Sequence, residues 1–113
     1  MKEGQTGSAP VVVIVGYRPK PDKVEVLDQL TREHYPILKK EGLVTDRTPI
    51  VMKASDGTVI EVFEWKSADA IGQAHTNEEV KKLWERYSAC CEFVPLAELK
   101  ESTDMFAGFT PFE

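Results

Sequence analysis

The chain contains few of the residues that mark metal sites, disulfide frameworks or redox motifs. Its 113 residues include only two histidines and two cysteines, and the cysteines are the neighbours Cys90 and Cys91. Adjacent cysteines suit neither an ordinary disulfide framework nor a CxxC motif. Two histidines on different expected elements give no zinc or iron ligand spacing. We therefore expect no metal and a reduced, cytoplasmic setting.

Long apolar runs and an excess of positive charge are also missing. The apolar run near the start, residues 11–15, is too short to span a bilayer, and Glu3 and Pro10 precede it in place of a basic signal region. Fourteen Lys and Arg are scattered along the chain against nineteen Asp and Glu, for a net charge of -5. We expect no export and neither nucleic acid nor membrane as a partner.

What remains has the composition of an ordinary globular protein, with 42% hydrophobic and 29% charged residues. The length allows one domain with one core. Residues 1–9 are rich in small polar residues without periodicity and predict a flexible tail. Residues 10–113 form the single expected domain.

Residues 11–15 are all Val or Ile and predict a first strand that is buried on both faces. Asp22 and Glu25 have the spacing of a capping box for a helix that Gly42 ends. Pro36 lies inside this helix, where it predicts a kink or a re-started turn.

Two strand-like runs, residues 48–54 and 58–65, flank Asp56-Gly57. This pattern predicts a β-hairpin, with a primed turn that needs positive φ at both Asp56 and Gly57.

Ser67 can cap a short helix that reaches Ala74, and Thr76 with Glu79 forms a second capping box. The second helix should carry one apolar stripe, and its end should turn Cys91 inward. A last strand is expected over residues 92–96. We expect the apolar tail, residues 105–112, to pack on the body or on a partner.

The resulting order is strand, helix, strand, strand, helix pair, strand, which is the split βαβ arrangement of an α+β, ferredoxin-like fold with an antiparallel sheet. In this arrangement both helices cover one sheet face. The second face then needs another cover, and we expect a second copy of the chain, making a homodimer.

Two stretches of the sequence resemble the dimeric α+β barrel superfamily, especially its antibiotic-biosynthesis-monooxygenase-like branch. They are residues 21–25 with residues 41–43, and residues 61–65 with Ser67 and residues 74–75. The resemblance implies a dimer with a cavity between sheet and helices. It also implies one of four roles: a cofactor-independent oxygenase, a haem-degrading enzyme, an isomerase or a protein of unknown role.

Trp65 and His75, ten residues apart, carry the sharpest match. The resemblance implies that, in the haem-degrading branch, the active site contains a strand Trp and a helix His at such spacing. It also implies an Asn on the first strand as a third residue of that site. This chain has only Asn77, and its first strand offers Gly16 and Tyr17 in that place.

His75 and His34 are the candidate catalytic residues, because imidazole can accept a proton near neutral pH. Each also has a simpler explanation. His75 can bond the last carbonyls of the preceding helix, and His34 can be a hydrogen-bonded core residue. The candidate substrate-binding residues are the aromatic side chains Trp65, Tyr35, Phe63 and Trp84. Packing explains these nearly as well.

Glu61 and Glu64 fall on opposite faces of their strand, so they cannot act as a carboxylate pair. We expect at least one of them to be semi-buried, with an arginine partner.

Two functions remain open. One is a cofactor-independent monooxygenase or isomerase that holds a small, mostly apolar or aromatic molecule. The other is a non-catalytic protein on the same scaffold that binds a small ligand or a partner, which the missing asparagine favours. A cavity that touches His34, His75 or Trp65 would distinguish the two.

Overall fold

A computed structural model describes residues 9–113 as a small α+β domain with a five-stranded antiparallel sheet and three α-helices. In chain order the elements are β1 Val11–Pro19, α2 Val24–Lys40, β2 Ile50–Lys53, β3 Val59–Trp65, α3 Ala68–Ala74, α4 Glu78–Cys90, β4 Cys91–Val94 and β5 Thr110–Pro111. Two short 3₁₀ turns, Leu96–Glu98 and Lys100–Thr103, follow β4. The expected order of elements is confirmed, with β5 as an addition. The tail expected over residues 1–9 lies, apart from Ala9, outside the described residues.

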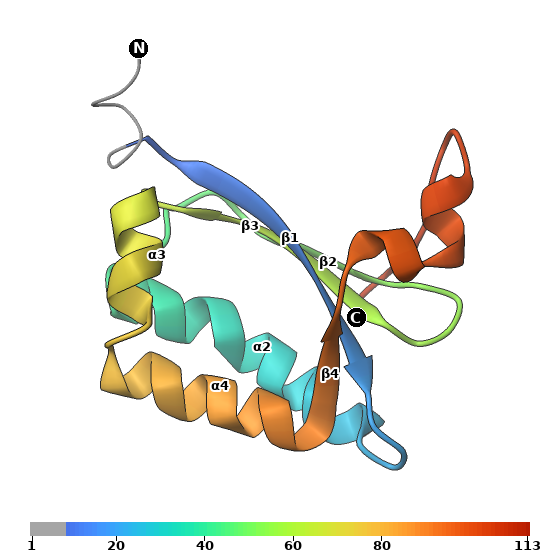
Figure 1. The fold of residues 1–113 in the computed structure, drawn as a ribbon, viewed down its shortest axis with the longest axis horizontal. Helices are drawn as coiled ribbons and strands as arrows, with labels where there is room; N and C mark the ends of the chain where they lie inside the picture. Colours follow the sequence, from blue (N-terminus) through green and yellow to red (C-terminus); the bar gives the residue numbers. More distant parts are fainter. Residues whose placement is uncertain (1–8) are drawn as a thin grey trace.

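The strands run in the order β4-β1-β3-β2-β5, and each pairs antiparallel with its neighbours. The three helices lie together on one side of the sheet (Figure 1). The apolar stripes of α2 and α4 face the sheet and are fully buried through Leu27, Leu30, Leu38, Val80, Leu83 and Tyr87. The core therefore sits between the helices and one face of the sheet.

The first strand alternates, although its sequence is apolar throughout. Val13, Val15 and Tyr17 point toward the helices, whereas Val12 and Ile14 on the other face are 54% and 49% exposed. In the single chain the second face of β1 is thus open, and its expected burial stays a prediction about a second copy.

The C-terminal segment covers part of this second face. Ile60 of β3 is fully buried against Leu99 and the half-buried Phe109. The expectation that the tail packs on the body holds for Phe109, while Met105 and Phe106 remain almost fully exposed. Apolar surface is consequently left open on the sheet and on the segment that crosses it.

The start of α2 differs from the expected capping box. The N-cap is Lys23, without a side-chain hydrogen bond, and Asp22 has a φ of 64°. Asp22 occupies the third position of a turn closed by a hydrogen bond from Lys23 N to Lys20 O, where positive φ is required as in a type II turn. Asp22 therefore serves the turn through its backbone conformation and does not cap the helix.

The other end of α2 is as expected, because Gly42 ends it with a φ of 76°. Pro36 lies within the helix, which continues unbroken to Lys40. The re-started turn expected there is absent.

The predicted cap of α3 is confirmed, and the predicted cap of α4 is wrong. Ser67 caps α3 by accepting a hydrogen bond from Ala70 N at 3.0 Å. For α4, Asn77 is the cap and accepts from Val80 N, so the predicted capping box of Thr76 was one residue too early. The Thr76 hydroxyl instead donates to a carbonyl at the end of α3.

The hairpin between β2 and β3 is confirmed, but its turn is not primed. Only Gly57 has positive φ, at 91°, and Asp56 does not. Gly57 N donates to Ala54 O, and Ala54 N donates to Thr58 O, which closes a three-residue loop with glycine in the left-handed position. The longer loop removes the need for positive φ at Asp56.

We predict that Gly57→Ala lowers the free energy of unfolding by about 1 kcal/mol or more, since a side chain at this φ is strained. Gly72→Ala in α3 is the matched control. No atom lies within 4 Å of the added methyl group at either glycine. The control should leave stability unchanged or raise it by up to about 1 kcal/mol. Chemical denaturation measures both, and equal stability of the two variants would contradict this turn.

Candidate functional site

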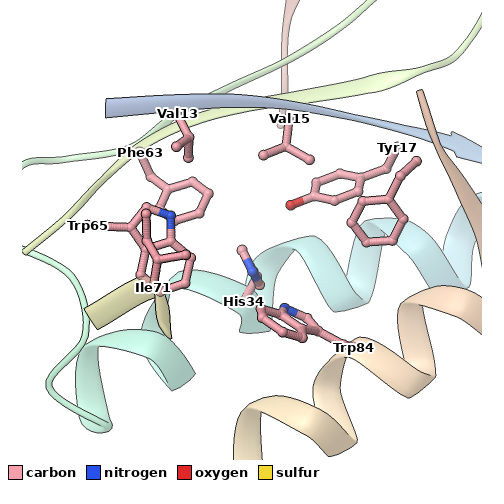
Figure 2. Close-up of a pocket in the computed structure, with 9 residues that line it drawn as sticks. Val13, Val15, Tyr17, His34, Phe63, Trp65, Ile71 and Trp84 are labelled. Atoms are coloured by element: carbon pink, nitrogen blue, oxygen red, sulfur yellow. The ribbon is translucent and has the colours of Figure 1, made fainter. Parts of the chain in front are cut away.

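A cavity of about 190 Å³ lies between the helix-covered face of the sheet and the helices (Figure 2). Its walls come from β1, β3, β4 and all three helices. The lining residues are Val13, Val15, Tyr17, His34, Phe63, Trp65, Ile71, Trp84 and Phe93. Aromatic and aliphatic side chains dominate the lining, and none of the described residues that form it is Lys, Arg, Asp or Glu.

Strand register explains how β1 and β3 build one wall. Val13 pairs with Phe63, and Val11 pairs with Trp65, so these side chains lie side by side on the same face. The rings of Phe63 and Trp65 are 5.4 Å apart. The sheet thus supplies a continuous apolar surface to the cavity.

His34 enters the cavity from α2 (Figure 2). It lies four residues from both Leu30 and Leu38, so it shares their inward stripe and is only 3% exposed. Its Nδ1 lies 2.8 Å from Oε1 of Glu61, although the N–H is not aimed well enough to count as a hydrogen bond. This close contact with a carboxyl oxygen favours the tautomer with the proton on Nδ1.

The other ring nitrogen of His34, Nε2, is the one that is open to the cavity. Nε2 has no hydrogen-bond partner among the described residues, and it is not fully buried. His34 lines the cavity, and because Nδ1 faces Glu61, Nε2 is the ring nitrogen that can face the cavity. A lone pair on Nε2 is therefore available to a molecule in the cavity.

Glu61 lies behind His34 and is 1% exposed. Its Oε1 accepts a hydrogen bond from the Tyr17 hydroxyl at 3.0 Å, while Oε2 has no partner within residues 9–113. A carboxylate in such surroundings is costly unless hydrogen bonds or charges compensate for lost water. Tyr17 and His34 provide that compensation from two other elements.

Tyr17 acts as a neutral donor to this carboxylate. Burial, and then the charge of Glu61, raise the pKa of Tyr17 well above its ordinary value. Tyr87 stacks on Tyr17 with 4.7 Å between ring centres, and burial likewise raises its pKa. Both phenols therefore stay protonated across the physiological range.

The arrangement Tyr17–Glu61–His34 has the form of a supported general base. If Nε2 takes a proton, the imidazolium forms beside a carboxylate that is already oriented by a hydrogen bond. An imidazole backed by a carboxylate recurs in proton-transfer sites because the carboxylate fixes the tautomer and stabilises the charge. This geometry can accept a proton from a weak acid in the cavity.

Of the residues expected from the sequence, the structure brings four together at the cavity: His34, Phe63, Trp65 and Trp84. Tyr35 is not in the lining, and its hydroxyl donates to the backbone carbonyl of Thr45.

His75 is exposed and lies outside the cavity lining. Its Nδ1 is 2.9 Å from the carbonyl of Ile71, as expected for a histidine that closes a helix end. The centroid of its ring lies 5.2 Å from the ring centroid of Trp84, in an edge-to-face arrangement. His75 therefore contacts Trp84 without lining the cavity, and the structure does not bring it into one cavity with Trp65.

Tyr17, Ile71 and Phe93 also line the cavity and were not among the candidates. The sequence carried a signal for Tyr17, which has the same strand parity as Val13 and Val15. No comparable signal marked Phe93, whose place depends on pairing between β4 and β1.

The partners of the two strand glutamates were only half expected. Glu64 has the predicted arginine, with Arg47 Nε 3.1 Å from its carboxylate. A hydrogen bond from Thr45, and then the one from Arg47, lower the pKa of Glu64. Glu61 is the more deeply buried of the two, and its partners are Tyr17 and His34 instead.

Residues 9–113 contain no group of three or more His, Cys, Asp or Glu side chains placed to hold a metal ion. Over the same part of the chain, no helix has the length and apolar character needed to cross a membrane.

Neither a scan against models of protein families nor a search of curated proteins finds a match to this chain.

We predict that Tyr17→Phe lowers the free energy of unfolding by about 1–3 kcal/mol, because the buried carboxylate of Glu61 loses its hydrogen-bond donor. Tyr87→Phe is the matched control, since within residues 9–113 the buried Tyr87 hydroxyl makes no hydrogen bond of good geometry. The control should be neutral or slightly stabilising. Urea unfolding at neutral pH compares the two, and equal losses would show that the bond from Tyr17 to Glu61 contributes nothing.

Proposed function

We propose that this protein binds a small, mostly apolar or aromatic molecule in the cavity and removes a weakly acidic proton from it with His34. The observation that carries the proposal is the position of His34, with Nε2 open to an aromatic cavity and Nδ1 2.8 Å from a buried carboxylate. A phenol or an enol has the required O–H group and the required flat, apolar body. Proximity to a fixed base is the main contribution to such a step.

The strand order supports the finer description of the fold. In β4-β1-β3-β2, each helical crossover connects two parallel strands that have an antiparallel strand between them, which is the split βαβ, ferredoxin-like arrangement. The resemblance to the dimeric α+β barrel superfamily then suggests a homodimer. The exposed Val12, Ile14 and Ile50 on the helix-free side of the sheet are the surface that a second copy would bury.

The activity we propose is cofactor-independent monooxygenation. Removal of the proton leaves an electron-rich anion that can react with dioxygen directly. For a phenol with a free para position the balance closes without an external reductant: one oxygen atom enters the ring to give a p-quinone, and the other leaves as water. The protein's contribution is to hold the anion away from bulk water beside an imidazolium.

The alternative is a non-catalytic protein that binds a small molecule in the same cavity. The cavity volume of about 190 Å³ is below the roughly 300–1,000 Å³ of most ligand sites, which favours a small ligand or none. The first strand also has no asparagine of the kind that the haem-degrading branch uses.

We predict that His34→Gln lowers the rate of oxygen uptake with resorcinol by roughly 100-fold or more, since the proton acceptor is lost. His75→Gln should keep the rate within a few-fold of the parent protein, because His75 lies outside the cavity. Circular dichroism and sedimentation check that both variants keep the fold and the assembly. If both variants keep full activity, or if no electron-rich phenol binds the parent protein at millimolar concentration, the oxygenase proposal fails and the binding alternative stands.

For the homodimer, we predict an apolar interface that buries well above about 1,200 Å² in total. Val12→Glu should dissociate it at micromolar concentration by placing a charge in that interface. Val26→Glu on α2 is the matched control, since Val12 and Val26 are 54% and 48% exposed. Sedimentation velocity measures both variants, and a parent protein that sediments as a stable monomer would end the dimer proposal.

A further inference from the structure

We infer that the cavity selects a neutral phenol with a single ring and excludes both fused-ring phenols and carboxylates. This inference rests on the function proposed above and narrows it to one ligand class. It follows from the size of the cavity, from the charges around it and from the placement of its base.

The size sets the number of rings. An apolar cavity of about 150 Å³ is known to accommodate benzene. The present cavity of about 190 Å³ leaves roughly 40 Å³ more, and one water-sized group needs about 10–15 Å³ of such volume. One ring with its oxygen and one small substituent therefore fits within the walls, whereas the four further carbons of a fused ring do not.

The charges decide the ionisation state in which the ligand enters. Among residues 9–113 no Lys or Arg lines the cavity, and the carboxylate of Glu61 lies directly behind His34. A carboxylate ligand would bring a negative charge of its own out of water and into the cavity in front of Glu61. A neutral phenol avoids this cost.

Proton transfer inside the cavity then preserves its net charge. The phenol O–H bond breaks, an N–H bond forms at Nε2 of His34, and the phenolate is left beside the imidazolium. The new positive charge lies between two negative groups, the phenolate and Glu61. Because the charges form as a pair, the apolar walls never surround an unpaired ion.

The walls also indicate which residue limits the size. Ile71 of α3 is half-buried, lines the cavity and packs against the cluster that contains Phe63 and Trp65 (Figure 2). Shortening it would extend the space beside the bound ring without touching Tyr17, Glu61 or His34. Ile37 of α2 offers a matched control, because it is also half-buried, packs against the core and does not line the cavity.

The test uses p-nitrophenol, whose phenolate absorbs at longer wavelength than the neutral form, at a pH where the free compound is neutral. The bound probe should show the phenolate spectrum with the parent protein and lose it with His34→Gln. Phenol should displace the probe at least tenfold more effectively than α-naphthol or benzoate. Ile71→Ala should improve displacement by α-naphthol about tenfold, and Ile37→Ala should not.

The possible failures are distinguishable. If α-naphthol or benzoate displaces the probe as well as phenol does, the inferred ligand class is wrong while proton transfer to His34 still stands. The ligand class is also wrong if Ile71→Ala and Ile37→Ala have equal effects. If no phenol binds, or if the bound probe stays neutral, the proposed function itself fails and the ligand class fails with it.

Discussion

The buried carboxylate of Glu61 is the constraint on which the centre of this protein depends. A carboxyl group that is 1% exposed needs polar partners, and it has them in the Tyr17 hydroxyl and the His34 ring. These three residues come from β3, β1 and α2, so the polar contact joins two strands and a helix around one point. The same contact orients His34, which leaves Nε2 to the cavity. The contacts that stabilise the buried carboxyl group of Glu61 are therefore the same contacts that prepare His34 to accept a proton.

Local signals in the sequence located most of the fold. Glycine at a position that needs positive φ ended α2 at Gly42, and Asp56-Gly57 marked the hairpin. The errors occurred where two local solutions compete. Asp22 could serve a helix cap or a turn, and the turn used it. Thr76 and its neighbour Asn77 both have side chains that can cap a helix, and Asn77 is the residue at the cap position of α4. Such choices depend on the path of the chain, which short motifs do not contain.

The site was predictable only in part, because its main contacts are long-range. Helical spacing turned His34 inward, and strand parity placed Phe63 and Trp65 on one face with Glu61. The sequence did not reveal that Glu61 meets Tyr17, 44 residues away, because that depends on the pairing of β1 with β3. Trp65 and His75 have a suggestive spacing, but the helix end holds the His75 ring outside the cavity.

The most direct test of the account is to observe the proton on His34. The chain has two histidines, so His75→Gln leaves His34 as the only imidazole, and nitrogen-15 NMR of labelled histidine reports on that ring alone. Without ligand, the account predicts a neutral ring with its proton on Nδ1, facing Glu61. With p-nitrophenol bound, it predicts an imidazolium together with the phenolate absorbance. A ring that stays neutral while the phenol is bound and ionised would contradict the assignment of His34 as the base.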